Sequence, residues 1–249
     1  QAFPERSMRS SWASTALITS ILAASLAGCT TYQHDQSRRS KIAQFIINHP
    51  VAARTIGVED YKSVNISSNA ARLAKRTGLD NKANGEGRGT QVNAVRHTLW
   101  QAAISSQFDS IIAERAGDAY LSDTEVREGK TDYFSRLAAD QAVDIRNNRI
   151  GRSIGSGKPQ ADMKTLAQAV LFYYKQVGLW TAAQVKGGNG RKVWRISQNK
   201  LSDAEYRRAL NNLEVLNSDG MTPFEERLYN PSKLREIKKS VEAIGNVQD

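Results

Sequence analysis

The feature that most constrains the fold of this chain is the helical spacing of its apolar residues. In residues 159–178 they recur every three or four positions and stop at Gly178. They are Met163, Leu166, Val170, Leu171, Tyr174 and Val177. This is the period of an amphipathic α-helix that buries one face. Similar patterns predict helices over about 91–117 and 132–150, so the sequence indicates a mainly α fold.

Three shorter helices are expected over 41–49, 67–79 and 233–245. The first ends before Pro50, because proline disfavours helical geometry in the residue that precedes it. The second has Ser67 or Ser68 as its N-cap.

One segment does not follow the helical period. Between residues 180 and 197, two short half-apolar runs flank Asn189-Gly190, a pair that is typical of tight hairpin turns. Helical signals then return at Ser202 and at Thr222, each with a glutamate three residues on that forms a capping box. Because no repeat or change of composition divides the rest, we expect a single helical domain over 42–249 with one small β-hairpin.

The N-terminal segment predicts a secretion signal. An apolar run of about 14 residues, Ala13 to Leu26, follows Arg9 and is shorter than the ~20 residues of a membrane-spanning helix. The run leads into Leu26-Ala27-Gly28-Cys29, which holds the only cysteine of the chain. This ending resembles the bacterial lipobox, in which the signal is cut before the cysteine. The resemblance implies that residues 1–28 are upstream residues and signal peptide.

The same resemblance implies a lipid anchor. Cys29 would carry a diacylglycerol and an acyl chain, and residues 29–41 would tether the domain to a membrane that it does not span. In Gram-negative lipoproteins a residue such as Thr30 at this place implies the outer membrane, here with the domain facing the periplasm.

The formal net charge of +10 favours anionic envelope components as further partners. No nucleic-acid-binding module is recognisable, so nucleic acid is not expected as a partner. A protein partner is not indicated by any motif.

A charged residue interrupts the apolar face of the helix expected after Gln91. At ~100° per residue, Arg96 falls inside the arc formed by the apolar residues of 92–108, and Asn93, His97 and Trp100 lie at its edge. A buried guanidinium without a partner is costly, so the fold has to supply a carboxylate.

Residues 139–155 contain the expected carboxylates. Asp140, Asp144 and Asn148 recur every four residues and therefore share one helical face with Tyr133 and Leu137. We expect the two helices to meet, with Arg96 and His97 opposite the two aspartates. Asn147 and Gly151 extend the same stripe, and the expected polar network also includes Asn93, Trp100, Asp118, Asn147, Asn148 and Arg152.

Three motifs in these segments carry a family resemblance. They are Asn93-Ala-Val-Arg-His-Thr-Leu-Trp100, Gly117-Asp-Ala-Tyr120 and Asp144-Ile-Arg-Asn-Asn-Arg-Ile-Gly-Arg152. Over residues 48–220 the chain resembles an uncharacterised bacterial family of secreted and lipid-anchored proteins. Its pattern is N-x-x-R-H-x-x-W, a G-D-A-H-E-like motif and D-x-x-N-N-x-x-G-R. Here Tyr120 and Leu121 replace the usual histidine and glutamate.

Two functions follow from the polar network. In the first, the domain has a binding or structural role, and the buried Arg, His, Asp and Asn side chains fix the register of the helices. In the alternative, it is an envelope hydrolase of phospholipid or cell wall, with His97 as general base or metal ligand beside Asp118, Asp140 and Asp144. The candidate catalytic residues are then His97, Arg96, Asp140 and Asp144.

The alternative also leaves a divalent metal open. The middle motif is loosely similar to the G-D-x-H element of zinc-dependent helical phospholipases and nucleases. One histidine with three aspartates suits a hard cation better than zinc. A catalytic site also predicts a cleft that reaches His97 and the aspartates beside the Gly85–Gly89 loop, where Arg88 could hold an anion.

Overall fold

The computed structural model describes residues 38–60, 62–82, 87–120, 129–188 and 190–229. All of them lie in the unit Ser37–Asp249. The expected signal peptide, Cys29, most of the expected tether and the helix at 233–245 lie outside the described residues.

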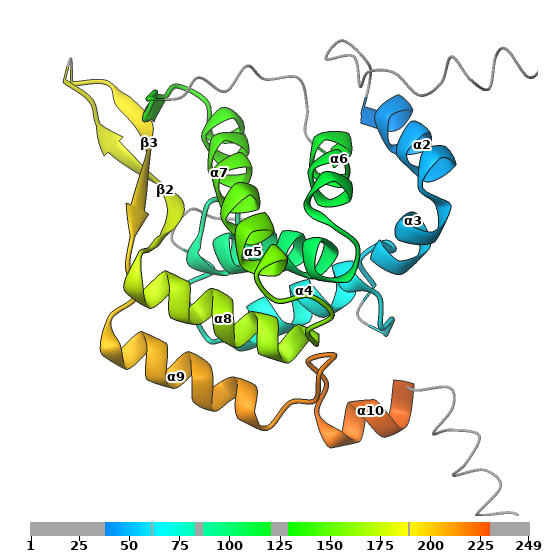
Figure 1. Ribbon diagram of the computed structural model, residues 1–249. Helices are drawn as coiled ribbons and strands as arrows, with labels where there is room; N and C mark the ends of the chain where they lie inside the picture. Colours follow the sequence, from blue (N-terminus) through cyan, green and yellow to red (C-terminus); the bar gives the residue numbers. More distant parts are fainter. Residues whose placement is uncertain (1–37, 61, 83–86, 121–128, 189, 230–249) are drawn as a thin grey trace, which may run out of the picture. The chain divides into compact units, whose positions relative to one another are not determined.

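The mainly α prediction is confirmed, since the described residues form nine helices and one small antiparallel sheet (Figure 1). The helices are α2 Arg38–Asn48, α3 Pro50–Ile56, α4 Ile66–Arg76, α5 Gln91–Gln107, α6 Ser110–Tyr120, α7 Arg136–Ser156, α8 Met163–Gln176, α9 Asp203–Glu214 and α10 Pro223–Tyr229. Within the described residues, none of these helices is both long enough and apolar enough to cross a membrane.

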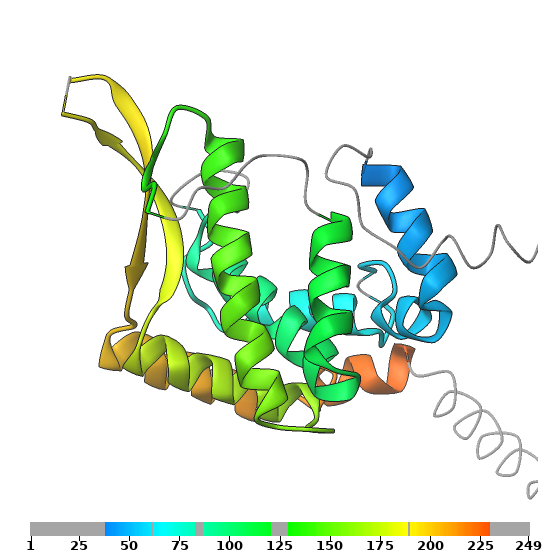
Figure 2. The same cartoon turned by 45° about the horizontal axis from the view of Figure 1, so that its top comes forward.

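The centre of the domain is the pair α5 and α7. Helix α5 also packs against α4, α6 and α8, so that it is buried on most of its circumference (Figures 1 and 2). Two glycines of α7 let the pair approach closely. A Cβ at Gly151 would collide with the backbone oxygen of Thr98, and one at Gly155 with that of Ala102. The expected meeting of the two polar helices is therefore confirmed.

The predicted hairpin is present as the strands β2 Leu179–Lys186 and β3 Lys192–Asn199. They pair antiparallel, with Lys186 opposite Lys192 at the turn. A third strand, β1 Asp132–Tyr133, pairs with the other edge of β3 and was not predicted. Tyr133 is thus a buried strand residue that packs on α7, and its expected place on the helical stripe is wrong.

Several predicted boundaries are corrected by local hydrogen bonds. The single helix over 91–117 is wrong, because α5 ends at Gln107 with Phe108 as its C-cap, and the Asp109 side chain accepts a hydrogen bond from Ile112 N (2.7 Å) to begin α6. Helix α4 is capped by Asn65, not by Ser67 or Ser68. Helix α2 begins at Arg38, so the last residues of the expected tether are helical.

Candidate functional site

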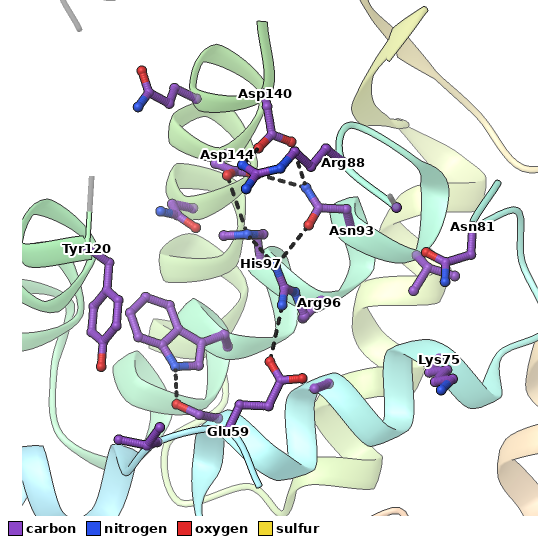
Figure 3. A pocket seen from close by; sticks show the side chains of 18 of the residues that line it. Glu59, Lys75, Asn81, Arg88, Asn93, Arg96, His97, Tyr120, Asp140 and Asp144 are labelled. Carbon is purple, nitrogen blue, oxygen red and sulfur yellow. Dashed lines mark hydrogen bonds and ion pairs between the residues drawn. The ribbon is translucent and has the colours of Figure 1, made fainter. Parts of the chain in front are cut away.

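A cleft of about 640 Å³ lies over α5 and α7 and is also lined by residues of α4, the loop after α3 and the turn before α5 (Figure 3). Its lining includes His97, Asp140 and Asp144, together with Gly87 and Arg88 of the glycine-rich loop. The cleft expected for a catalytic site is therefore present at the predicted residues.

The N-terminus of α5 positions the first polar side chains. Thr90 is the N-cap, and its hydroxyl accepts a hydrogen bond from Asn93 N while it donates one to Gly87 O (2.7 Å). This arrangement fixes the turn that carries Arg88 against the first turn of the helix. Because Asn93 and His97 are four residues apart, their side chains lie on the same face.

Asp140 is held between an arginine and an amide (Figure 3). Its Oδ2 lies 3.3 Å from Arg88 Nη1, and its Oδ1 accepts from Asn93 Nδ2 at 3.4 Å. Burial has the largest effect and raises the pKa of Asp140 above its ordinary value, although the charge of Arg88 and the hydrogen bonds from Arg88 and the Gly89 backbone oppose this rise. Arg88 thus favours the ionised form of this carboxyl.

Asp144 has a different set of neighbours. Its Oδ1 accepts from Asn93 Nδ2 at 3.0 Å, and its Oδ2 lies 3.4 Å from His97 Nε2. Burial and the negative charge of Asp140 raise the pKa of Asp144 well above its ordinary value. No arginine contacts this carboxyl within the described residues, so it is the one of the two that holds a proton more readily.

His97 is a neutral histidine. Burial and the charge of Arg96 lower the pKa of His97 to about 3, and a hydrogen bond with Asn148 acts in the opposite direction. Its Nε2 lies 3.3 Å from Arg96 Nη2, which can only donate. The Nε2 lone pair therefore faces the donor Arg96, and the proton of the neutral ring lies on Nδ1. With 23% of the side chain exposed, the ring is reached from the cleft.

Arg96 does not make the expected ion pair with Asp140 or Asp144, and this prediction is wrong. Its Nη1 pairs with Glu59 Oε2 at 3.2 Å, and its Nη2 donates to Asn93 Oδ1 at 3.0 Å. The side chain is 39% exposed, because it extends from α5 toward the loop after α3. Sequence periodicity gave no signal for Glu59, since that residue lies in a loop.

Aromatic side chains form another part of the lining. Trp100 Nε1 donates to Ser67 Oγ at 3.1 Å, and its ring meets Tyr120 edge-on at 5.5 Å between centroids. Arg38 lies over the Tyr120 ring at 5.7 Å. Tyr120 thus adds a ring to this wall.

Three expected network members lie elsewhere. Asn147 holds β2 against α7, because its amide exchanges two hydrogen bonds of 2.9 Å with the Trp180 backbone. Arg152 donates to Gln101, and Asp118 is an exposed residue of α6 whose charge acts on Arg152. The four-residue spacing correctly predicted that Asp140, Asp144 and Asn148 lie together, and all three line the cleft. It could not predict that Asn147, on a neighbouring face of α7, contacts β2 instead.

The expected ligand set of His97 with three aspartates is therefore not assembled. In the part of the chain that the structure describes, no group of three or more His, Cys, Asp or Glu side chains is arranged to hold a metal ion.

Comparison with known proteins gives one match. The family model described as "Domain of unknown function (DUF6973)" matches residues 51–177. This range contains every cleft-lining side chain except that of Arg38. No curated protein and no solved structure matches the chain.

Proposed function

Since the chain belongs to the family of the domain of unknown function DUF6973, we propose its activity from the cleft itself: it is a bacterial envelope hydrolase. In this proposal Asp144 is the general acid and Asp140 the general base. The neutral ring of His97, 3.4 Å from Asp144, offers this carboxyl no charge partner and so helps to keep it protonated beside the cleft.

The observation that carries the proposal is the pair of carboxyls one helical turn apart in opposite environments. Asp140 faces the cation Arg88, whereas Asp144 faces the neutral ring of His97. Environments that separate the proton affinities of two carboxyls are typical of acid–base pairs in hydrolases. Asp140 would take a proton from water as it attacks the substrate, and Asp144 would give one to the leaving group. Solvent exchange then restores both carboxyls.

The lining of the cleft supports an anionic substrate with a flat or apolar portion. Lys75, Arg88 and Arg96 supply positive charge, and Trp100 and Tyr120 supply ring faces. Phospholipids and cell-wall components of the envelope both combine anionic groups with a flat or apolar portion, so these are the two proposed substrate classes.

The test is turnover of the two substrate classes by the purified chain. Labelled phospholipid vesicles and labelled peptidoglycan are incubated with wild type and with His97→Ala, both with Mg²⁺ and with a chelator, which also tests the open metal expectation. Wild type should release product from one class. His97→Ala should lower the rate about a hundredfold with little loss of melting temperature. No product from either class would refute the hydrolase.

The second candidate is a non-catalytic binding or structural role. It is favoured by Tyr120, because the resembled family more often has a histidine at that place, and its replacement by tyrosine disfavours a function that needs a second histidine. For this candidate, His97→Ala should unfold the domain or lower its melting temperature markedly, and wild type should show no turnover.

We further propose that acyl chains on Cys29 hold the domain at the outer membrane, facing the periplasm. Several acyl chains give a stable anchor at ~0.8 kcal/mol per buried methylene. Cys29→Ser should move the protein from the membrane fraction to the soluble fraction after cell lysis. Labelled fatty acid should enter wild type but not the variant, and equal labelling of both would contradict the anchor.

A further inference from the structure

Helices α2 and α3 present an apolar surface that nothing in the described domain covers. Ile46 and Ile47 are 50% and 77% exposed, and Val51 is 72% exposed. Helix α2 buries its opposite side, through Lys41 and Phe45, and packs against α6 (Figures 1 and 2). Single exposed apolar residues are common on protein surfaces, but a contiguous group of them marks an interaction site.

Exposed basic residues flank this apolar group. We call the set the α2–α3 surface; its members are Arg39, Ala43, Ile46, Ile47, Pro50, Val51 and Arg54. Residues 38–56 contain four lysines and arginines and no aspartate or glutamate. Apolar side chains between basic ones are the pattern of helices that lie in the interface of an anionic membrane.

Helix α6 extends the surface. Ile111 is 59% exposed, and Arg115, one turn later on the same face, contacts His49 between α2 and α3 through Nη1 and Nε2 at 3.1 Å. The apolar character therefore continues beyond the two helices, and Asp109, whose charge acts on His49, adds a carboxylate at this edge.

The proposed anchor is close enough to bring this surface to a membrane. Eight residues lie between Cys29 and Arg38, the first residue of α2, and the nine residue steps span at most about 30 Å when fully extended. The reach of the tether matters only if Cys29 is lipidated as proposed. The exposed apolar residues and the basic residues of the α2–α3 surface do not depend on that lipidation.

The α2–α3 surface is also next to the cleft. Arg38 of α2 and Gly57 and Val58, which follow α3, line the cleft of the candidate site. We propose that the α2–α3 surface docks on the surface of an anionic phospholipid bilayer, with Ile46, Ile47 and Val51 entering the interface and Arg39 and Arg54 contacting phosphate groups. Docking places the rim of the cleft at the lipid surface.

The experiment uses residues 29–249 with Cys29→Ser, so that no acyl chain contributes. Binding is measured by co-sedimentation with vesicles of phosphatidylethanolamine and phosphatidylglycerol, and with vesicles of phosphatidylcholine. The unaltered surface should bind the anionic vesicles more tightly, and added salt should weaken that binding. Val51→Glu and Ile47→Glu should each lower the affinity about tenfold or more, because each loses apolar burial and adds a repelled charge.

Val215→Glu is the matched control. Val215 is 69% exposed at the end of α9, outside the α2–α3 surface, and its replacement should leave vesicle binding unchanged. Equal binding of all variants, or equal loss in Val215→Glu, would overturn the proposal. So would a dimer that dissociates in Val51→Glu without any vesicle binding, since the surface would then join two copies of the chain.

Failure of this proposal is distinguishable from failure of the hydrolase. Val51 does not line the cleft. The Val51→Glu variant should therefore hydrolyse substrate that is dispersed in detergent, or a soluble fragment of it, at the wild-type rate. Loss of vesicle binding with that rate retained supports the docking surface by itself.

Discussion

Replacing Asp144 by asparagine should lower the rate of the proposed hydrolysis by about a hundredfold or more, because an amide cannot give a proton to a leaving group. Asparagine keeps nearly the same shape and can still accept the hydrogen bond from Asn93. The measurement is product release under single-turnover conditions. Asp203→Asn, which changes an exposed carboxylate outside the cleft, should keep the wild-type rate.

The same variant should reveal the cost of burying this carboxyl. Burial and Asp140 raise the pKa of Asp144 in the folded state. The folded protein therefore holds this proton more tightly than the unfolded chain, and the stabilisation is fully present below the unfolded pKa of 3.8 and lost as pH rises through the folded pKa. The melting temperature of wild type relative to Asp144→Asn should fall as pH rises over that range. A constant difference would contradict the raised pKa.

Gly155→Ala should lower the free energy of unfolding of the domain by about 3 kcal/mol, which is the upper end of the range found when an extra methyl group is forced into a packed core. A Cβ at this position would collide with the backbone oxygen of Ala102, and a backbone atom cannot move aside as a side chain can. Helix propensity alone predicts the opposite sign, since alanine is favoured over glycine in a helix by about 1 kcal/mol. Urea unfolding measures the difference, and Gly151→Ala should behave alike.

The control for the glycine prediction is Gly188→Ala. Nothing lies within 4 Å of a Cβ built at Gly188, so this change should alter the free energy of unfolding by less than about 0.5 kcal/mol. Gly155→Ala with unchanged or increased stability would contradict the close backbone contact of α5 and α7.

The helices and the hairpin could be predicted because their signals are local. The period of apolar residues in α8, the caps at Ser202 and Thr222 and the turn pair at 189–190 each lie within a few residues of the element that they specify. The break after α5 was missed because no glycine or proline marks it, and Ile111 and Ile112 continue the apolar period.

The contacts between helices could be predicted only where both partners are periodic. His97 and Asp144 lie on such faces, and the structure brings them to 3.4 Å. Arg96 instead pairs with Glu59, 37 residues away in a loop, and Asp132 and Tyr133 of β1 pair with Arg195 and Trp194, much later in the chain. Neither contact follows a period, because each depends on how the loops are placed by the assembled helices.

The most direct measure of the proposed acid–base arrangement is the protonation state of His97. Nuclear magnetic resonance of isotope-labelled imidazole rings, followed across pH, reports the charge and the tautomer of each histidine. Because the pKa of His97 is lowered to about 3, its ring should still be neutral near pH 5, where an ordinary histidine is almost fully charged, with the proton on Nδ1. If the His97 ring instead becomes charged at a pH near the ordinary histidine pKa of 6.5 or above, it forms an ion pair with an ionised Asp144. That result would contradict Asp144 as the general acid.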